Sequence, residues 1–452
     1  MPNNRIFVVR AKQEFKTKKE MVENVSKENV GIVSKENVEK IDVIEDVTLA
    51  DEISDLVPES AYFKSEFFKG LSPILFLARI FGMFFKRYKV KGQWMTEKWV
   101  WFCVGVVVIQ LFSLARSCSV FTLQEEFSDT LFFKLQIGLW GMENTVKLLA
   151  MIYASFRKSC FPEFFQTWMR VCNDKPLDKR LLVVRKLALT LSCNFVFVNT
   201  LGMITTILFV PDLNELYLKL SWPDADTLST GYMYKWLFVL CSFVGSGISM
   251  FSISLLVILS FAITNEFYDV ANKITTYINK DGSFDGDLEK LRQRHQGLCR
   301  LTEILDESFM AIIAIVYVAN VPMSCVILYN IIYHTHSTSL NLFNIFWMVS
   351  LILHMSVVSL VCARVNVAAH KPLDELYNIS ANSLHHQQIQ LIMFMNRLTG
   401  SEVGLTAIKM FVINRPTILT VIGMLITYFV LLVQFKTPAV AVCNCGNNVT
   451  SS

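Results

Sequence analysis

Residues 234–262 read YKWLFVLCSFVGSGISMFSISLLVILSFA, and this stretch decides the fold. It carries a single charged residue, Lys235, close to its beginning. About 20 consecutive apolar residues cross the ~30 Å hydrocarbon core of a bilayer as a helix, so the stretch predicts a transmembrane helix. The whole chain of 452 residues is 53% hydrophobic and 18% charged, with a mean hydropathy of +0.43. A soluble domain does not carry that balance.

Further apolar stretches predict an all-α, polytopic membrane protein. The first six spans are expected at about residues 98–117, 131–156, 187–210, 234–262, 309–333 and 340–362. Two more apolar segments follow, at residues 387–413 and 416–435. This last pair forms either one broken helix or two crossings, and the choice decides the topology.

The distribution of Lys and Arg predicts the orientation, because short cytoplasmic loops collect these residues. The loop between the second and third spans contains Arg157, Lys158, Arg170, Lys175, Lys179, Arg180, Arg185 and Lys186. It is therefore expected inside, whereas the acidic loop before the fourth span is expected outside. A multi-pass protein of the plasma membrane with a cytoplasmic N-terminus follows, and its C-terminus is extracellular if the last pair crosses once.

The last span ends in TYFVLLVQF at residues 427–435. Thr427, Leu431 and Gln434 lie at i, i+4 and i+7, so they share one face of a helix. An amide at the end of a stripe of small and apolar residues fits a water-lined pore with a hydrophobic gate. A polar contact between helices of one protomer fits it equally well.

Thr-Tyr, five hydrophobic residues and Gln-Phe resemble the C-terminal signature of insect-type gustatory receptors. Residues 402–415, EVGLTAIKMFVINR, resemble the segment that joins the two halves of that family's seventh helix. The resemblance covers residues 67–435 in outline. It implies seven transmembrane helices, a broken seventh helix, and a homotetrameric or heteromeric ligand-gated channel for monovalent and divalent cations. The implied pore and gate residues are Thr427, Leu431, Gln434 and Phe435.

These expectations divide the chain into eight segments. They are a disordered cytosolic tail (1–61), an interfacial or re-entrant helix (62–90), transmembrane helices 1–4 (91–264), a cytosolic helical extension (265–304), transmembrane helices 5–6 (305–363), a cytosolic anchor region with the first half of helix 7 (364–415), the pore-lining half of helix 7 (416–435) and an extracellular tail (436–452). Loosely structured cytosolic loops are the alternative to the helical extension.

Polar residues in the outer halves of the first six spans predict a ligand pocket. The candidates are Gln136, Trp140, Glu143, Asn144, Asn320, Asn330, Asn344 and Trp347. The indole rings of Trp140 and Trp347 present flat faces to the C–H groups of a pyranose, while the carboxylate and amides bind its hydroxyls. An i, i+4 ion pair between Glu143 and Lys147 is the plainer reading of those two residues.

Three stretches resemble the sugar-receptor branch of the family, at residues 72–78, at 318–324, and at 346–351 with 363–368 after it, although His354 stands where that branch carries an Arg. We therefore expect a small polar tastant, a sugar, as ligand. A light- or peroxide-sensing receptor that uses the Trp residues as chromophores is an alternative, as is a chemoreceptor for another ligand.

The sequence contains no metal-ligand spacing, nucleophile elbow or Gly-rich phosphate loop. We therefore expect no enzymatic activity, no cofactor, no metal and no nucleic-acid partner. Membrane lipid is the expected surroundings of the helices.

Overall fold

A computed structural model of the chain describes residues 61–90, 93–119, 129–209, 228–333, 338–380, 387–400 and 402–434. Most of these residues are helical, which confirms the predicted all-α polytopic fold. Nearly all of the predicted N-terminal tail, all of the predicted extracellular tail and Phe435 lie outside the described residues.

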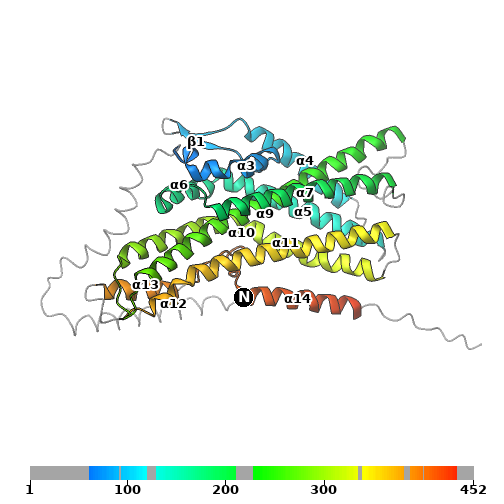
Figure 1. The fold of residues 1–452 in the computed structure, drawn as a ribbon. Coiled ribbons are helices and arrows are strands. Elements are labelled where there is room, and N and C mark those ends of the chain that lie inside the picture. Colours follow the sequence, from blue (N-terminus) through cyan, green and yellow to red (C-terminus); the bar gives the residue numbers. More distant parts are fainter. Residues whose placement is uncertain are drawn as a thin grey trace, which may run out of the picture. The chain divides into compact units, whose positions relative to one another are not determined.

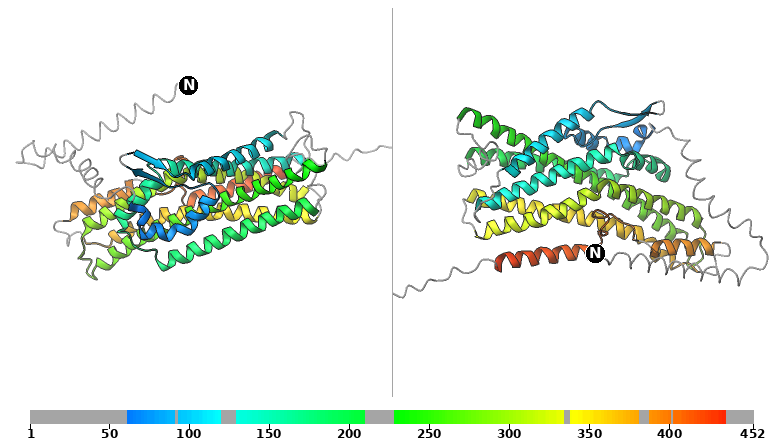
Figure 2. Two further views of the ribbon diagram at one scale, coloured as in Figure 1. Left: turned by 90° about the horizontal axis from the view of Figure 1, so that it is seen from above. Right: turned by 180° about the vertical axis from the view of Figure 1, so that it is seen from behind.

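Long helices run side by side in the unit that begins at Tyr62 (Figures 1 and 2). They are α4 (Val100–Ser119), α5 (Asp129–Phe156), α7 (Lys179–Phe209), α9 (Leu228–Tyr277), α10 (Leu288–Tyr333) and α11 (Thr338–His370). All except α5 are long and apolar enough to cross a membrane. Helix α5 is the exception because its polar residues, which include Glu143, Asn144 and Lys147, lower the mean hydropathy of the helix.

Two of these helices are far longer than a bilayer is thick. The 50 residues of α9 and the 46 of α10 extend about 75 and 69 Å at 1.5 Å per residue, against about 30 Å of hydrocarbon. Both therefore continue beyond the apolar layer, and the segment expected as a helical extension contains their ends. The turn between them is closed by a bridge between Ile278 and Phe284, with Gly282 at φ +80°.

The chain before α4 differs from the single helix expected at residues 62–90. A short 3-10 helix, η1 (Ala61–Lys64), leads into α3 (Glu66–Ile80), and an antiparallel hairpin of β1 (Arg87–Val90) and β2 (Gln93–Thr96) follows. Strands of four residues show too little alternation to be recognised in a sequence.

An amphipathic helix, α6 (Phe161–Cys172), lies in what the sequence analysis treats as a loop. It buries Phe161, Phe164, Phe165, Trp168 and Cys172 at helical spacing. The ring of Trp168 stacks on Phe67 of α3 at a centroid distance of 4.0 Å. This aromatic contact joins the two short helices to each other.

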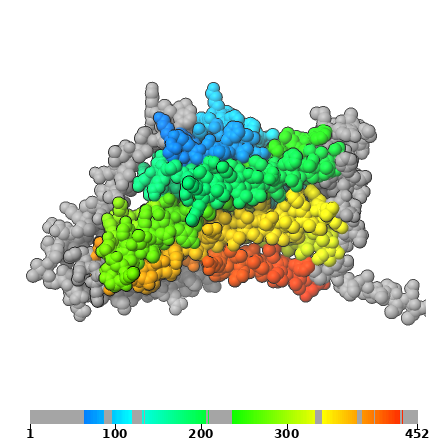
Figure 3. Space-filling model, viewed as in Figure 1, coloured from blue at the N-terminus to red at the C-terminus, as the bar shows by residue number. Residues whose placement is uncertain are grey.

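The C-terminal part contains three shorter helices. They are α12 (Pro372–Leu376), α13 (Gln388–Gly400) and α14 (Arg415–Gln434). The non-helical segment between α13 and α14 is held by Asp306 of α10, whose carboxylate accepts hydrogen bonds from the backbone N–H (2.6 Å) and the hydroxyl (2.9 Å) of Thr406. Asn366 of α11 also donates to the carbonyl of Val403 at 3.0 Å. The beginning of α14 is thereby fixed to two long helices, and α14 lies at the edge of the bundle (Figure 3).

Gly247 of α9 provides the first prediction. A Cβ atom at this position would lie 2.1 Å from Cε1 of Phe81, which packs against the helix. We expect Gly247→Ala to destabilise the protein by about 1–3 kcal/mol through overpacking, seen as a lower apparent Tm of the purified protein in detergent. Gly105→Ala in α4 is the matched control, since its Cβ would meet no described atom within 4 Å. Equal Tm values for the two variants would contradict the packing described.

Candidate functional site

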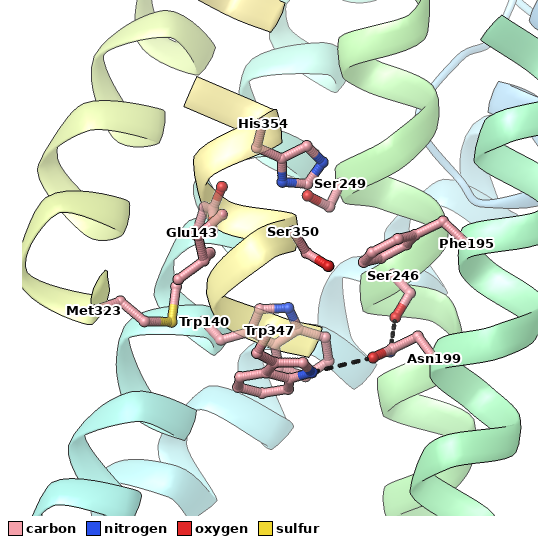
Figure 4. Close-up of a pocket in the computed structure, with 11 residues that line it drawn as sticks. Trp140, Glu143, Phe195, Asn199, Ser246, Ser249, Met323, Trp347, Ser350 and His354 are labelled. Carbon is pink, nitrogen blue, oxygen red and sulfur yellow. Dashed lines mark hydrogen bonds between the residues drawn. The ribbon is translucent and has the colours of Figure 1, made fainter. Parts of the chain in front are cut away.

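A small pocket lies inside the helical bundle (Figure 4). Its volume is about 30 Å³, measured as the space open to the centre of a water molecule. The helices α5, α7, α9, α10 and α11 contribute its lining, which is Trp140, Glu143, Phe195, Asn199, Ser246, Ser249, Met323, Trp347, Ser350, Leu351 and His354. The pocket therefore lies between five helices, whose lining residues are far apart in the sequence.

One wall of the pocket is aromatic. The rings of Trp140 and Trp347 lie 6.0 Å apart between centroids, at an interplanar angle of 35°. Gly245 of α9 makes room for this wall, because a Cβ there would lie 3.2 Å from Trp140 and 2.9 Å from the amide nitrogen of Asn144. Met323 and Leu351 pack with Trp347 in the same apolar cluster. Such a wall offers an apolar surface to a ligand.

Beside this wall, a chain of hydrogen bonds orients Trp347 (Figure 4). Its indole N–H donates to Oδ1 of Asn199 at 3.3 Å. Nδ2 of Asn199 donates to Oγ of Ser246 at 2.6 Å, and that hydroxyl donates to the carbonyl of Ser242 in its own helix. Because indole N–H groups need a partner when buried, Asn199 fixes the ring while it links α11, α7 and α9.

A buried ion pair lies at the edge of the pocket. Nζ of Lys147 is 2.5 Å from Oε1 of Glu143, and their side chains are 0% and 2% exposed. Lys147 also donates to Oγ of Ser249 at 2.8 Å, and Nδ2 of Asn320 donates to Oε1 of Glu143 at 3.4 Å. A buried pair is tolerated where neutral groups satisfy its remaining hydrogen-bonding capacity, and Ser249 and Asn320 have that role here.

The structure brings only some of the predicted ligand residues together. Trp140, Glu143 and Trp347 line the pocket, and Asn320 reaches it through Glu143. The other four are buried but do not line it, and each has a side-chain polar atom without a hydrogen-bond partner among the described residues: Gln136, Asn144, Asn330 and Asn344.

Three of these amides share helix faces with pocket residues. Gln136 precedes Trp140 by four positions, and Asn344 precedes Trp347 by three, so each lies one turn away on the same face. Asn330 follows Met323 by seven positions, and the nearby contact between Phe132 and Tyr329 shows that α5 and α10 meet at this end of the bundle. Unpaired polar groups thus continue from the pocket toward that end.

Several residues that line the pocket are not among those that the sequence predicts. Asn199, Ser246 and Ser249 are ordinary residues of apolar helices when they are taken singly. The spacing of Ser242, Ser246 and Ser249 by four and three positions is a usable signal, because it defines one polar stripe on α9. Phe195, Met323 and Leu351 carry no such signal, since their chemistry is that of any packed residue.

Thr427, Leu431 and Gln434, three of the four predicted pore residues, lie on α14, away from the pocket, and Phe435 lies outside the described residues. Val421 and Leu425 pack against the core, while Thr427, Leu431 and Gln434 are exposed on the opposite face. A Cβ at Gly423, on that exposed face, would meet no described atom within 4 Å. The described part of the chain therefore leaves this face of α14 uncovered.

A bundle of long apolar helices around an aromatic and polar pocket defines a polytopic membrane protein. The fold is similar to that of the insect olfactory receptor OR5 from Machilis hrabei in complex with eugenol, with a TM-score of 0.67 and 15% identity over 83% of this chain and 100% of that one. A second structure of the same receptor has a TM-score of 0.65 and 15% identity, over 81% of this chain and 98% of that one.

The model of the trehalose receptor family matches residues 227–445. This match confirms the resemblance to insect gustatory receptors that the motif at residues 427–435 predicts. Both the family whose model matches and the structural neighbours are receptors and not enzymes. The chain has no match among curated protein sequences.

Asn199 provides the second prediction. Asn199→Leu keeps the side-chain volume but leaves the N–H of Trp347 and the hydroxyl of Ser246 without this partner. We expect a loss of about 1–3 kcal/mol in stability, measured as a lower Tm in detergent. Thr200→Val is the control, because the Thr200 hydroxyl bonds only to its own helix at the Val196 carbonyl among the contacts described. A stable Asn199→Leu protein would show that Trp347 is oriented by packing alone.

Proposed function

We propose that this receptor is a ligand-gated, non-selective cation channel that a sugar opens. The observation that carries the proposal is the pocket, whose lining combines two indole rings with a carboxylate, an amide and hydroxyl groups between five helices. Aromatic rings bind the C–H faces of a pyranose, and the polar groups bind its hydroxyls. The match to the trehalose receptor family supports the same ligand class.

The size of the pocket indicates how a sugar binds. A volume of about 30 Å³ holds water molecules and not a sugar ring, so binding has to widen the bundle. The amide group of Gln136 and the amide oxygens of Asn330 and Asn344 have no hydrogen-bond partner among the described residues, and they favour such widening because each gains hydrogen bonds when hydroxyl groups enter. The ligand thereby favours an expanded arrangement of helices over the compact one.

We further propose a homotetramer, or a heteromer with related receptors, around an axis lined by α14. The uncovered face of α14 supports this, since four such faces would meet each other instead of lipid. Thr427, Leu431, Gln434 and Phe435 form the pore and gate for monovalent and divalent cations. The Lys- and Arg-rich loop before α7 supports a cytoplasmic N-terminus, with the C-terminus outside the plasma membrane.

Whole-cell currents from cells that express this chain alone test the ligand. We expect mono- or disaccharides to evoke a cation current, and Trp347→Leu to raise the half-maximal sugar concentration by at least about tenfold, or ~1.4 kcal/mol. Trp236→Leu is the control, because Trp236 is 55% exposed on the surface of α9.

Ultraviolet light is applied in the same experiment, because the pair of Trp140 and Trp347 would also suit a light sensor. A light-evoked current without a sugar response would favour that alternative. Silence to both stimuli, with surface expression shown, would contradict a sugar-gated channel formed by this chain alone and favour a required partner subunit or another ligand.

Gln434 tests the pore. We expect Gln434→Ala to change the relative permeability of monovalent and divalent cations while the half-maximal sugar concentration stays within about twofold, because the amide lines the pore and not the pocket. Asn396→Ala removes an exposed amide from α13 and serves as the control. Permeability ratios that are equal in all three proteins would place the pore elsewhere.

A further inference from the structure

The ion pair of Glu143 and Lys147 gives the pocket a carboxylate whose charge is balanced inside the bundle. Glu143 lines the pocket, and Lys147 reaches the same wall through its hydrogen bond to Ser249. The remaining lining residues are neutral by chemistry, apart from the titratable ring of His354. The fixed charges at this wall therefore cancel.

We propose that the pair of Glu143 and Lys147 determines the charge class of the ligand, so that the pocket accepts uncharged polyols and excludes ammonium and carboxylate ligands. This inference rests on the proposed sugar-gated function and adds the specificity of the same site. A charged ligand would lose its hydration in a site where both protein charges are already neutralised by each other.

The contacts of the pair leave hydrogen-bonding capacity for neutral groups. Oε1 of Glu143 is occupied by Lys147 and Asn320, whereas no described bond is made by Oε2. A carboxylate accepts about four hydrogen bonds, so hydroxyl groups of a ligand can still bind to it. Lys147 uses two of its three N–H groups on Glu143 and Ser249, which leaves the ammonium group largely satisfied.

A purely structural pair would behave differently. If it only held α5 in place, shape would select the ligand, and removing one charge would weaken all sugars alike. If it sets the charge class, then Lys147→Met leaves a carboxylate at the wall that an ammonium ligand can neutralise. Glu143→Gln leaves an ammonium group that a carboxylate ligand can neutralise. The double variant is neutral again.

The test uses the full chain in whole-cell recordings at neutral pH. Glucose and trehalose are the uncharged probes, glucosamine is the cationic probe and glucuronate is the anionic probe. In the wild type we expect half-maximal concentrations at least about tenfold higher for both charged probes than for glucose. Lys147→Met should lower the value for glucosamine relative to glucose by about tenfold or more, and Glu143→Gln should do the same for glucuronate.

Two further variants separate charge from packing. The double variant Glu143→Gln/Lys147→Met should return to the wild-type order of probes, and it avoids an uncompensated buried charge if a single variant fails to reach the surface. Ser249→Ala removes the second partner of Lys147 but no charge, so it should keep the wild-type order.

Three results are possible, and each decides the inference. The inference is supported if the order of half-maximal concentrations among the probes changes in the two single variants, Lys147→Met and Glu143→Gln, and stays as in the wild type in the double variant and in Ser249→Ala. A wild type that responds equally to glucose, glucosamine and glucuronate, or variants that all keep one order, would overturn the inference and leave the sugar-gated function intact. A wild type on the cell surface that is silent to both glucose and trehalose would overturn the proposed function together with the inference.

Discussion

Hydrocarbon offers no hydrogen-bond partner, so the membrane-spanning parts of this structure have to satisfy most of their polar groups within the protein. The backbone does so by forming long helices. The side chains do so by pairing across helices, as Lys147 does with Glu143 and Ser249, and as Asn199 does with Trp347 and Ser246. The polar contacts of the interior are therefore the points at which separate helices are joined.

The same constraint separates two kinds of surface within one chain. Five helices turn polar and aromatic groups inward around the pocket, whereas α14 packs through Val421 and Leu425 and leaves its other face uncovered. Asn414 caps the first turn of α14 by accepting a hydrogen bond from the N–H of Thr417 at 3.1 Å. The helix is thus anchored at its beginning, by its cap and by the segment that Asp306 holds.

Hydropathy predicts the apolar spans because the bilayer acts on composition alone, and the bulky polar residues Trp140, Glu143 and Trp347 are conspicuous inside those spans. The sequence does not predict α6 or the hairpin, since both are too short or too mixed in composition. The sequence also does not predict that Asn199 and Met323 line the pocket, because their positions depend on how the five helices are rotated about their axes. Four predicted amides are buried near the pocket but not in its lining, for the same reason.

Helix α10 has a part in both regions. Asn320 of α10 bonds to Glu143 at the pocket, and Asp306 of the same helix holds the segment that leads into α14. Fourteen residues separate the two, which is about 21 Å along the axis and close to four full turns, so both side chains point from nearly the same face. A helix that rotates about its axis as a rigid body turns all of its side chains together. A rotation that releases Asn320 at one end turns Asp306 by the same angle at the other.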